Sequence, residues 1–389
     1  MISGKRLLIV HSSAELYGSD RSLLDFVSLQ KDGFSITVLL PEEGPLSLRL
    51  RMVGARVVVG EVCKVQRHMF GPLGLLRTVM AMCRAVLYIR RLAGDQPFDL
   101  VYTNTIAVFA GAIYALVSRR PHVWHIREIL ADSPALTYAF RRVVSALSSV
   151  IICNSEQTRR WIELPKSRDR CRVVWNGVAV AEPLGRRESE RKQRGWEDGT
   201  VVFALVGRLN AWKGQSLALQ AFERVHAALF GKVALWLVGS PFLGQEHFEQ
   251  RLRKQLAISS ACTAARLDAF RQDVDAVWEA ADVVLVPSIE PEPFGRVAIE
   301  AMAFGRPVIA AAHGGLLDIV IDGSSGLLVL PRDVDALAAA MQRLAIDSEL
   351  RIRLGVQALT RQQEVFSVEA YVQGVTRALQ DALDSKRLV

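Results

Sequence analysis

The chain has 389 residues, of which 50% are hydrophobic and 23% are charged. A chain of this length usually folds as two or three domains, and this composition excludes an intrinsically disordered protein. The formal net charge is +8, but residues 1–180 carry 24 lysines and arginines against 14 acidic residues, whereas the remainder carries 24 against 26. Two interpretations fit this asymmetry: a solvated basic face, or an anionic partner such as a phosphorylated acceptor, a membrane surface or nucleic acid.

Five cysteines without a C-x-x-C pair predict neither a zinc site nor a disulfide framework, and reduced thiols favour a cytoplasmic protein. The N-terminal residues become polar too early for a signal peptide and predict a first strand instead. Residues 100–118 are uncharged and long enough to be considered as a membrane span. Because Thr103, Asn104 and Thr105 interrupt this stretch, we predict a strand that ends at Tyr102, a loop, and a buried helix over residues 106–117.

Short apolar runs alternate with helical patterns along the chain, which indicates parallel sheets covered by helices. Strands in the first half are predicted at residues 6–10, 36–40, 56–59, 100–102, 123–125 and 150–153. Helices are predicted between them, for example at residues 21–30 and 75–92. A charged stretch over residues 182–200 then interrupts the pattern and predicts an interdomain connection with a polar helix.

The second half repeats the α/β pattern. Its strands are predicted at residues 201–206, 234–238, 283–286, 307–311 and 327–330, and its last helices at 334–345 and 368–383. We therefore expect two Rossmann-like domains, residues 1–180 and residues 181–367, with a deep cleft between them. The C-terminal segment 368–389 is expected to cross back and join the first domain.

Ligands of open parallel sheets bind where the strands end, so residues that directly follow strands are candidate site residues. After the strand at 201–206, Gly207 permits a tight turn, and Arg208 and Lys213 place two cations over the strand end. Two cations suit a diphosphate, because arginine clamps oxygens in a bidentate manner and lysine acts as a point charge. Two ordinary surface cations would produce the same pattern.

A second candidate site follows the strand at 283–286. Glu292 precedes a predicted helix and Glu300 lies on its second turn, where a carboxylate can accept hydrogen bonds from the two hydroxyls of a diol. Phe294 and Gly295 offer backbone amides at the helix start to a hydroxyl or a phosphate. A purely structural role for both glutamates, at a helix start and in a polar contact, remains the alternative.

Three further positions follow strands. Gly314 and Gly315 come after the strand at 307–311 and can form an anion-binding nest of backbone N–H groups, although an ordinary turn has the same sequence. In the first half, His125 ends a strand, where a histidine is more often structural. Gly18 opens a predicted helix after the first strand and permits a ligand to approach the backbone closely.

Together these motifs resemble the signature of glycosyltransferase family 4. The matching residues occur in the order of the family and close to its spacing: Gly207, Arg208, Lys213, Gly214, Glu292, Pro293, Phe294, Gly295, Glu300, Gly305, Gly314, Gly315 and Asp318. The two glutamates, eight positions apart, are the most specific element, and weaker similarity extends over nearly the whole chain. The chain departs from the family pattern at Tyr17, Ala179 and Asp318, where glycine, aspartate and glutamate are more common.

The resemblance implies the GT-B fold and retaining transfer of a sugar from a nucleotide-diphosphate donor, with UDP or GDP as the nucleotide. It implies that Arg208 and Lys213 neutralise the diphosphate, that Glu292 holds the transferred sugar and that His125 contacts this sugar from the first domain. These four are the predicted catalytic residues. The implied donor-binding residues are Gly18, Gly207, Phe270, Arg271, Phe294, Gly295, Glu300, Gly314 and Gly315, with Glu300 on the ribose and Phe270 and Arg271 at the base.

The resemblance also implies the partners: a nucleotide sugar and a glycan or lipid-linked acceptor, as in bacterial polysaccharide or glycolipid synthesis, with no nucleic acid. No cofactor is expected, and no metal site, because Asp273 and Asp275 have D-x-D spacing but are predicted to start a helix. The alternatives are a nucleotide-sugar epimerase or phosphorylase, and a non-catalytic nucleotide- or glycan-binding protein. A nicotinamide dehydrogenase is disfavoured because no G-x-G-x-x-G follows the first strand.

The stretch over residues 63–91 combines basic and apolar side chains. Its basic residues are Lys64, Arg67, His68, Arg77, Arg84, Arg90 and Arg91, and its apolar residues include Met69, Phe70, Leu73, Leu75, Leu76, Val79, Met80, Val86, Leu87 and Tyr88. Such a segment can lie in an anionic membrane interface, which predicts peripheral contact of the basic N-terminal domain with the inner face of the cell membrane. A domain helix with its apolar face in the core is the alternative.

Overall fold

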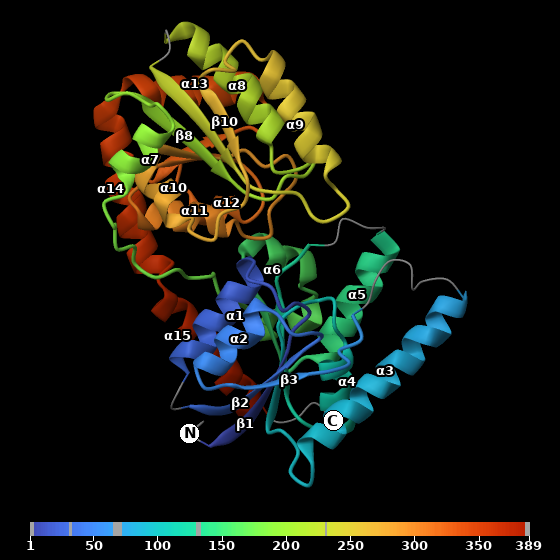
Figure 1. The fold of residues 1–389 in the computed structure, drawn as a ribbon. Coiled ribbons are helices and arrows are strands. Elements are labelled where there is room, and N and C mark those ends of the chain that lie inside the picture. Colours follow the sequence, from blue (N-terminus) through green and yellow to red (C-terminus); the bar gives the residue numbers. More distant parts are fainter. Residues whose placement is uncertain (1–3, 31–32, 65–71, 130–133, 230–231, 386–389) are drawn as a thin grey trace. The chain divides into compact units, whose positions relative to one another are not determined.

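The computed structural model describes residues 4–30, 33–64, 72–129, 134–229 and 232–385, with the backbone alone for residues 72–76 and 135. The chain divides into two compact units (Figure 1). The N-terminal unit comprises Met1–Gly177 and Val368–Val389, and the C-terminal unit comprises Val178–Ser367. Within the described ranges, no helix is long and apolar enough to cross a membrane.

The described part of the N-terminal unit contains a seven-stranded parallel sheet in the order β3-β2-β1-β4-β5-β6-β7. Its strands are β1 (Lys5–Val10), β2 (Phe34–Leu40), β3 (Arg56–Val59), β4 (Leu100–Thr103), β5 (His122–Ile126), β6 (Val150–Cys153) and β7 (Cys171–Val173). The strand order reverses between β1 and β4, and doubly wound sheets bind ligands beside such a reversal. His11 and Asn104 directly follow these two strands.

Helices cover both faces of this sheet (Figure 1). They are α1 (Gly18–Leu29), α2 (Pro45–Met52), α3 (Pro72–Ala93), α4 (Ala110–Val117), α5 (Pro134–Leu147), α6 (Glu156–Ile162), the short 3-10 helix η2 (Pro165–Arg170) and α15 (Val368–Asp384). Helices α1, α2 and α15 pack on one face, and α3 to α6 on the other. The C-terminal helix belongs to this unit because Tyr371, Val375 and Leu379 are buried in the same cluster as Leu7 and Phe26. Each large apolar side chain buried in this way stabilises the unit by about 1.5–3 kcal/mol.

The helix predicted over residues 106–117 begins only at Ala110. The residues before it form a hydrogen-bonded loop, in which the Trp124 indole N–H donates to the carbonyl of Thr105 at 2.8 Å. The N–H of Ile106 donates to the Glu128 carboxylate at 3.2 Å. These contacts satisfy polar backbone groups that a helical turn would otherwise have to satisfy.

The C-terminal unit contains, in its described part, a six-stranded parallel sheet in the order β10-β9-β8-β11-β12-β13. Its strands are β8 (Val201–Val206), β9 (Val233–Val238), β10 (Ala265–Asp268), β11 (Val283–Val286), β12 (Val308–Ala311) and β13 (Gly326–Val329). Its helices are α7 (Arg187–Gln193), α8 (Gln215–Ala228), α9 (His247–Ile258), α10 (Asp275–Ala280), α11 (Arg296–Ala303), α12 (Leu316–Ile319), α13 (Val334–Ile346) and α14 (Ser348–Val365). The strand order reverses between β8 and β11, so the loops that follow these strands are brought together.

The charged connection before β8 is held to its own unit by ion pairs. Arg186 pairs with Glu279 at 2.8 Å, and Arg187 pairs with Asp282 at 2.5 Å. Asp273, one of the two aspartates with D-x-D spacing, also pairs with Arg186, and Asp275 is the first residue of α10. The predicted polar helix is therefore present as α7, and its charges are used for packing against α10.

Candidate active site

Lys213 and Glu292 meet at the strand reversal of the C-terminal unit. Nζ of Lys213 donates to Oε1 of Glu292 at 2.8 Å, and the two side chains are only 18% and 7% exposed. Ser288 donates to the same carboxylate oxygen. Because the pair is largely removed from water, the ammonium group is held in one orientation at the carboxyl ends of the strands.

The loop between β8 and α8 has a defined shape. Oδ1 of Asn210 accepts the N–H groups of Trp212 and Lys213 at 3.1 and 3.0 Å. Gly214 has a φ of +81°, and a Cβ atom there would lie 2.2 Å from the carbonyl oxygen of Pro287, in the loop after β11. Glycine at this position therefore lets the two loops pack directly against each other.

The loop between β12 and α12 is hydrogen-bonded to the loop between β11 and α11. The N–H of Gly315 donates to the carbonyl of Glu292 at 2.7 Å, and Nε2 of His313 donates to the carbonyl of Ser288 at 2.8 Å. Gly314 has a φ of +63°, and a Cβ atom there would lie 2.4 Å from the Glu292 carbonyl oxygen. The structure thus brings together four predicted site residues, Lys213, Glu292, Gly314 and Gly315.

The helix α11 begins at the expected place, because Gly295 is its N-terminal cap with a φ of +112°. Phe294 is buried, and its ring packs on Phe366 at 6.1 Å between centroids. Glu300 accepts from Nε of Arg296, one turn earlier, at 2.9 Å. A ligand hydroxyl on Glu300 would therefore share this carboxylate with an arginine.

The other predicted donor-binding residues of this unit contact groups outside that cluster. The Arg208 guanidinium lies 3.2 Å above the centroid of the Phe242 ring, in the loop after β9. Arg271 makes two hydrogen bonds of 2.8 Å to Glu190 in α7, and the N–H of Phe270 donates to Ser240. The segment 269–271 directly follows β10, a strand that the sequence analysis did not predict.

Gly207 directly follows β8, and its N–H donates to the carbonyl of Val238 at the end of β9. A Cβ atom on Gly207 would meet the Lys213 side chain at 3.6 Å, which is an ordinary contact. Gly239 is more restricted, because its Cβ would lie 1.9 Å from the Gly207 carbonyl oxygen. The backbone of Gly207 therefore borders both the lysine and the end of β9.

In the N-terminal unit, His125 and Gly18 are the predicted site residues. His125 lies in β5 and is fully buried, with its Nδ1 2.7 Å from the Tyr102 hydroxyl. Burial lowers the pKa of His125 well below its usual range, and the charge of Arg127 adds to this effect, so the ring is neutral at pH 7. Gly18 is exposed and is the first residue of α1, which Tyr17 precedes as the cap.

Residues 186–361 match the family model described as glycosyl transferases group 1, and residues 18–182 match that of glycosyltransferase family 4. A D-inositol 3-phosphate glycosyltransferase of Stackebrandtia nassauensis is 35% identical over 306 residues, which cover 72% of this chain and 68% of that protein. The chain belongs to glycosyltransferase family 4. A second protein of that name, from Acidothermus cellulolyticus, is 34% identical to this family 4 chain over 262 residues, covering 64% of it. The match spans 57% of that relative's own length.

A solved structure supports the fold of this family 4 chain. Anabaena HepE in complex with UDP and glucose is similar with a TM-score of 0.82 and 25% identity, covering 97% of this chain and 99% of that one. The two α/β units, with their strand orders, therefore have the GT-B fold that the resemblance implied.

Sequence reasoning missed several side chains of this family 4 chain that contact the predicted site residues or their hydrogen-bond partners. Ser288 lies in a loop that was already a candidate, four positions before Glu292, where a hydroxyl can reach a carboxylate. Tyr102 and Asn104 lie at the end of β4, beside the strand reversal, and this position was the signal that could have identified them. Phe242 had no such signal, because its contact with Arg208 depends on how the loop after β9 folds.

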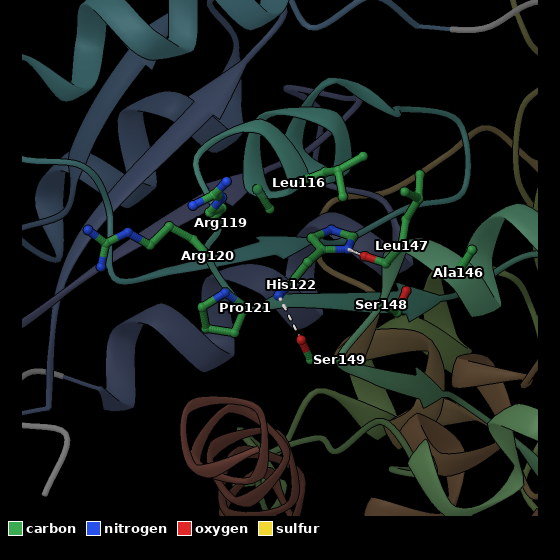
Figure 2. Close-up of a pocket in the computed structure, with 10 residues that line it drawn as sticks. Leu116, Arg119, Arg120, Pro121, His122, Ala146, Leu147, Ser148 and Ser149 are labelled. Atoms are coloured by element: carbon green, nitrogen blue, oxygen red, sulfur yellow. Dashed lines mark hydrogen bonds between the residues drawn. The ribbon is translucent and has the colours of Figure 1, made fainter. Parts of the chain in front are cut away.

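A separate pocket of about 380 Å³ opens at the amino end of β5 (Figure 2). His125 lies toward the opposite end of that strand. His122 borders the pocket, and its Nδ1–H donates to the Leu147 carbonyl at 3.0 Å (Figure 2), so its Nε2 accepts from the Thr103 hydroxyl at 2.8 Å. Both ring nitrogens are satisfied in the neutral form. None of the predicted site residues of this family 4 chain lines this pocket.

The buried His122 predicts acid sensitivity of folding. Burial lowers its pKa from 6.5 to about 3, so below pH 6.5 the unfolded chain takes up a proton that the folded chain does not. We expect this group alone to reduce the free energy of unfolding by about 2 kcal/mol between pH 7.5 and pH 5. Urea unfolding at both pH values should show that acidification lowers the free energy of unfolding of His122→Asn by about 2 kcal/mol less than that of the wild type. Equal decreases in the two proteins would contradict the low pKa of His122.

Proposed function

We propose that the chain transfers a sugar from a UDP- or GDP-sugar to a glycan or lipid-linked acceptor, with retention of anomeric configuration and without a metal ion. The observation that carries this proposal is the contact of Lys213 with Glu292 beside Gly314 and Gly315, at the carboxyl ends of β8, β11 and β12. Family membership and the similarity to a protein crystallised with UDP and glucose support the same assignment.

In the proposed reaction, the bond between the anomeric carbon and the diphosphate oxygen breaks, and the acceptor oxygen attacks on the same face. The acceptor proton passes to the leaving phosphate oxygen. Charge develops on the diphosphate, so its stabilisation by fixed cations and backbone amides is the main catalytic task. Lys213, Arg208 and the N–H groups of Phe294 and Gly295 are the donors we assign to it.

Other groups have supporting roles in this proposal. Glu292 lies beside the oxocarbenium-like sugar, and Glu300 accepts from the ribose hydroxyls. Gly207 and Gly18 permit close approach of the phosphates, and Arg208 leaves the Phe242 ring when the diphosphate binds. Phe270 is half exposed and contacts the base, whereas the Arg271 side chain is held by Glu190 and contributes through its backbone.

Metal independence rests on the donor set. Among the described residues, no group of three or more His, Cys, Asp or Glu side chains is placed to hold an ion. Asp273 is already paired with Arg186. Transfer activity that persists undiminished in excess EDTA is expected, and loss of activity restored by a divalent cation would contradict this part of the proposal.

A donor and acceptor screen tests the function itself. The chain is incubated with UDP-, GDP- and dTDP-sugars and with glycans, lipid-linked sugars or D-inositol 3-phosphate, and products are identified by mass spectrometry. A glycosylated acceptor with release of the nucleotide diphosphate is expected with one donor. An epimerised donor would instead indicate an epimerase, and a free sugar phosphate would indicate a phosphorylase. Nucleotide binding without turnover would indicate a non-catalytic binding protein.

We also propose that α3 contacts an anionic membrane surface. Its buried face, with Ala85 and Ile89, packs in the core of the N-terminal unit. The exposed face of α3 carries Met80, Arg84, Leu87 and Arg91. These residues are three or four positions apart, so apolar and cationic side chains alternate along one line of the helix. Arg77 and Arg90 are also exposed, and the described helix has no acidic residue. Arg67, His68, Met69 and Phe70, which the prediction also included, lie outside the described residues.

Charge removal tests this contact. We expect the triple variant R77S/R84S/R91S to bind phosphatidylglycerol vesicles about 100-fold more weakly, at ~1 kcal/mol per arginine, with salt weakening the wild-type binding. The variant R251S/R253S/R353S removes the same charge from exposed positions of the C-terminal unit and should bind like the wild type. Co-sedimentation with anionic and neutral vesicles measures the affinity of the wild type and of each variant. If the two variants weaken binding to anionic vesicles equally, α3 has no role in the contact.

A further inference from the structure

A chain of buried hydrogen bonds leads to His125 in the N-terminal unit. The Tyr102 hydroxyl lies 2.7 Å from Nδ1 of His125 and donates to Oδ1 of Asn104 at 2.9 Å. Nε of Arg127 donates to the same Asn104 oxygen at 2.7 Å. All four side chains are at most 6% exposed. In contrast, Nε2 of His125 is buried without a hydrogen-bond partner in the part of the chain that the structure describes.

The donors and acceptors in this chain determine where the protons lie. The guanidinium of Arg127 can only donate, so the Asn104 atom that faces it is the oxygen. That oxygen has a second lone pair, which the Tyr102 hydroxyl fills with its single hydrogen. The Tyr102 oxygen is then an acceptor toward His125, and Nδ1 of His125 must carry the hydrogen in their 2.7 Å contact. The neutral ring has one N–H, so Nε2 presents a bare lone pair.

The contact of the Asn104 amide nitrogen is consistent with this orientation of the amide. Its Nδ2 lies 3.3 Å from Nδ1 of His11, which accepts from the amide. His11 then directs its Nε2–H at Asp20, 2.7 Å away. Burial also raises the pKa of Tyr102, so its hydroxyl keeps the hydrogen that the network needs.

Arg127 is itself held from three sides. Besides Asn104, it donates from Nη1 to Asn176 at 2.7 Å and from Nη2 to the Tyr371 hydroxyl of α15 at 2.8 Å. Its guanidinium cannot lose its proton, and these described acceptors are neutral oxygens in a buried site. The arginine therefore fixes the amide of Asn104 in one orientation.

We propose that Tyr102, Asn104 and Arg127 are positioning residues that keep the hydrogen of His125 on Nδ1, so that Nε2 accepts a hydrogen bond from a hydroxyl of the bound sugar. A buried acceptor without a partner is costly, and a sugar hydroxyl is a donor that satisfies it. The sugar contact rests on the proposed transferase function, whereas the position of the hydrogen in the free chain does not.

Nitrogen-15 NMR of the histidine-labelled full chain without substrate tests the position of the hydrogen. Neutral histidine in water favours the Nε2–H form, so a ring with its hydrogen on Nδ1 is diagnostic, and subtraction of the His125→Asn spectrum identifies it. We expect Nδ1–H in the wild type and a shift toward Nε2–H in Tyr102→Phe. The control is Tyr114→Phe, which removes the hydroxyl of another buried tyrosine, packed on Phe98 in a different cluster.

Kinetics test the sugar contact. Tyr102→Phe should lower kcat/KM for the sugar donor about tenfold, the size of one hydrogen bond, and leave the affinity for the free nucleoside diphosphate unchanged because that molecule lacks the transferred sugar. Tyr114→Phe should keep both values. Nε2–H in the wild type, or the same spectrum in wild type and Tyr102→Phe, would overturn the positioning role. The expected spectra in a chain that turns over no nucleotide sugar would refute the transferase function and the sugar contact, but leave the positioning role standing.

Discussion

Replacing Lys213 with alanine is expected to lower kcat/KM for sugar transfer by about 100- to 1000-fold, the range found when one preorganised donor to a developing negative charge is removed. The Lys213 side chain is 18% exposed, and Glu292 holds its ammonium group at 2.8 Å, so little reorganisation is needed when the diphosphate arrives. Its loss also leaves the buried Glu292 carboxylate without this cation, which increases repulsion of the phosphates. Steady-state kinetics with the donor found in the screen measure the effect.

Two variants separate the charge from general damage to the fold. Lys213→Arg keeps a cation but replaces a point charge by a planar fork, so a loss of about tenfold is expected. Lys232→Ala removes an exposed lysine of the same unit and should retain wild-type kinetics. If Lys213→Ala transfers sugar within about twofold of the wild-type rate, the diphosphate assignment is wrong.

Replacing Gly314 with alanine is expected to reduce activity at least about 100-fold, the cost of misplacing a reacting group by roughly 1 Å. The residue has a φ of +63°, and its new Cβ would lie 2.4 Å from the carbonyl oxygen and 2.7 Å from the nitrogen of Glu292. Backbone atoms cannot rotate away as a side chain can, so the loop that carries Glu292 has to shift. The free energy of unfolding should fall by about 3 kcal/mol.

Gly323 provides a matched control in the same unit. Its φ is +70°, and a Cβ atom there meets nothing within 4 Å. Gly323→Ala therefore has the same backbone strain without the collision, and should cost only about 1 kcal/mol of stability and keep its activity. Urea unfolding and donor kinetics on both variants compare the two effects. Equal activity of the two variants would show that the Gly314 loop does not shape the site.

The fold was largely predictable because the hydrophobic patterning of parallel α/β units is strong. The buried strands β1, β2, β8, β9 and β11 appear in the sequence as apolar runs close to their observed limits. Two strands escaped prediction for physical reasons. β7 has only three residues, and β10 contains an arginine and an aspartate whose side chains are not fully buried.

The candidate site was predictable in its parts but not in its contacts. Glycines and charges after strands indicated which loops matter, yet Lys213 and Glu292 are 79 positions apart, and their contact depends on β8 pairing with β11. The partners of Arg208 and Arg271, Phe242 and Glu190, come from other loops and helices. No local pattern in the sequence specifies such pairings, because they arise from the packing of the whole unit.

The most direct measurement is a crystal structure of the chain with the nucleoside diphosphate of its donor. We expect the β-phosphate to lie within hydrogen-bonding distance of Lys213 Nζ and of the amides at the start of α11, with Arg208 released from the Phe242 ring. A diphosphate bound elsewhere on the chain, with Lys213 still in contact with Glu292 alone, would contradict the assignment of the donor site.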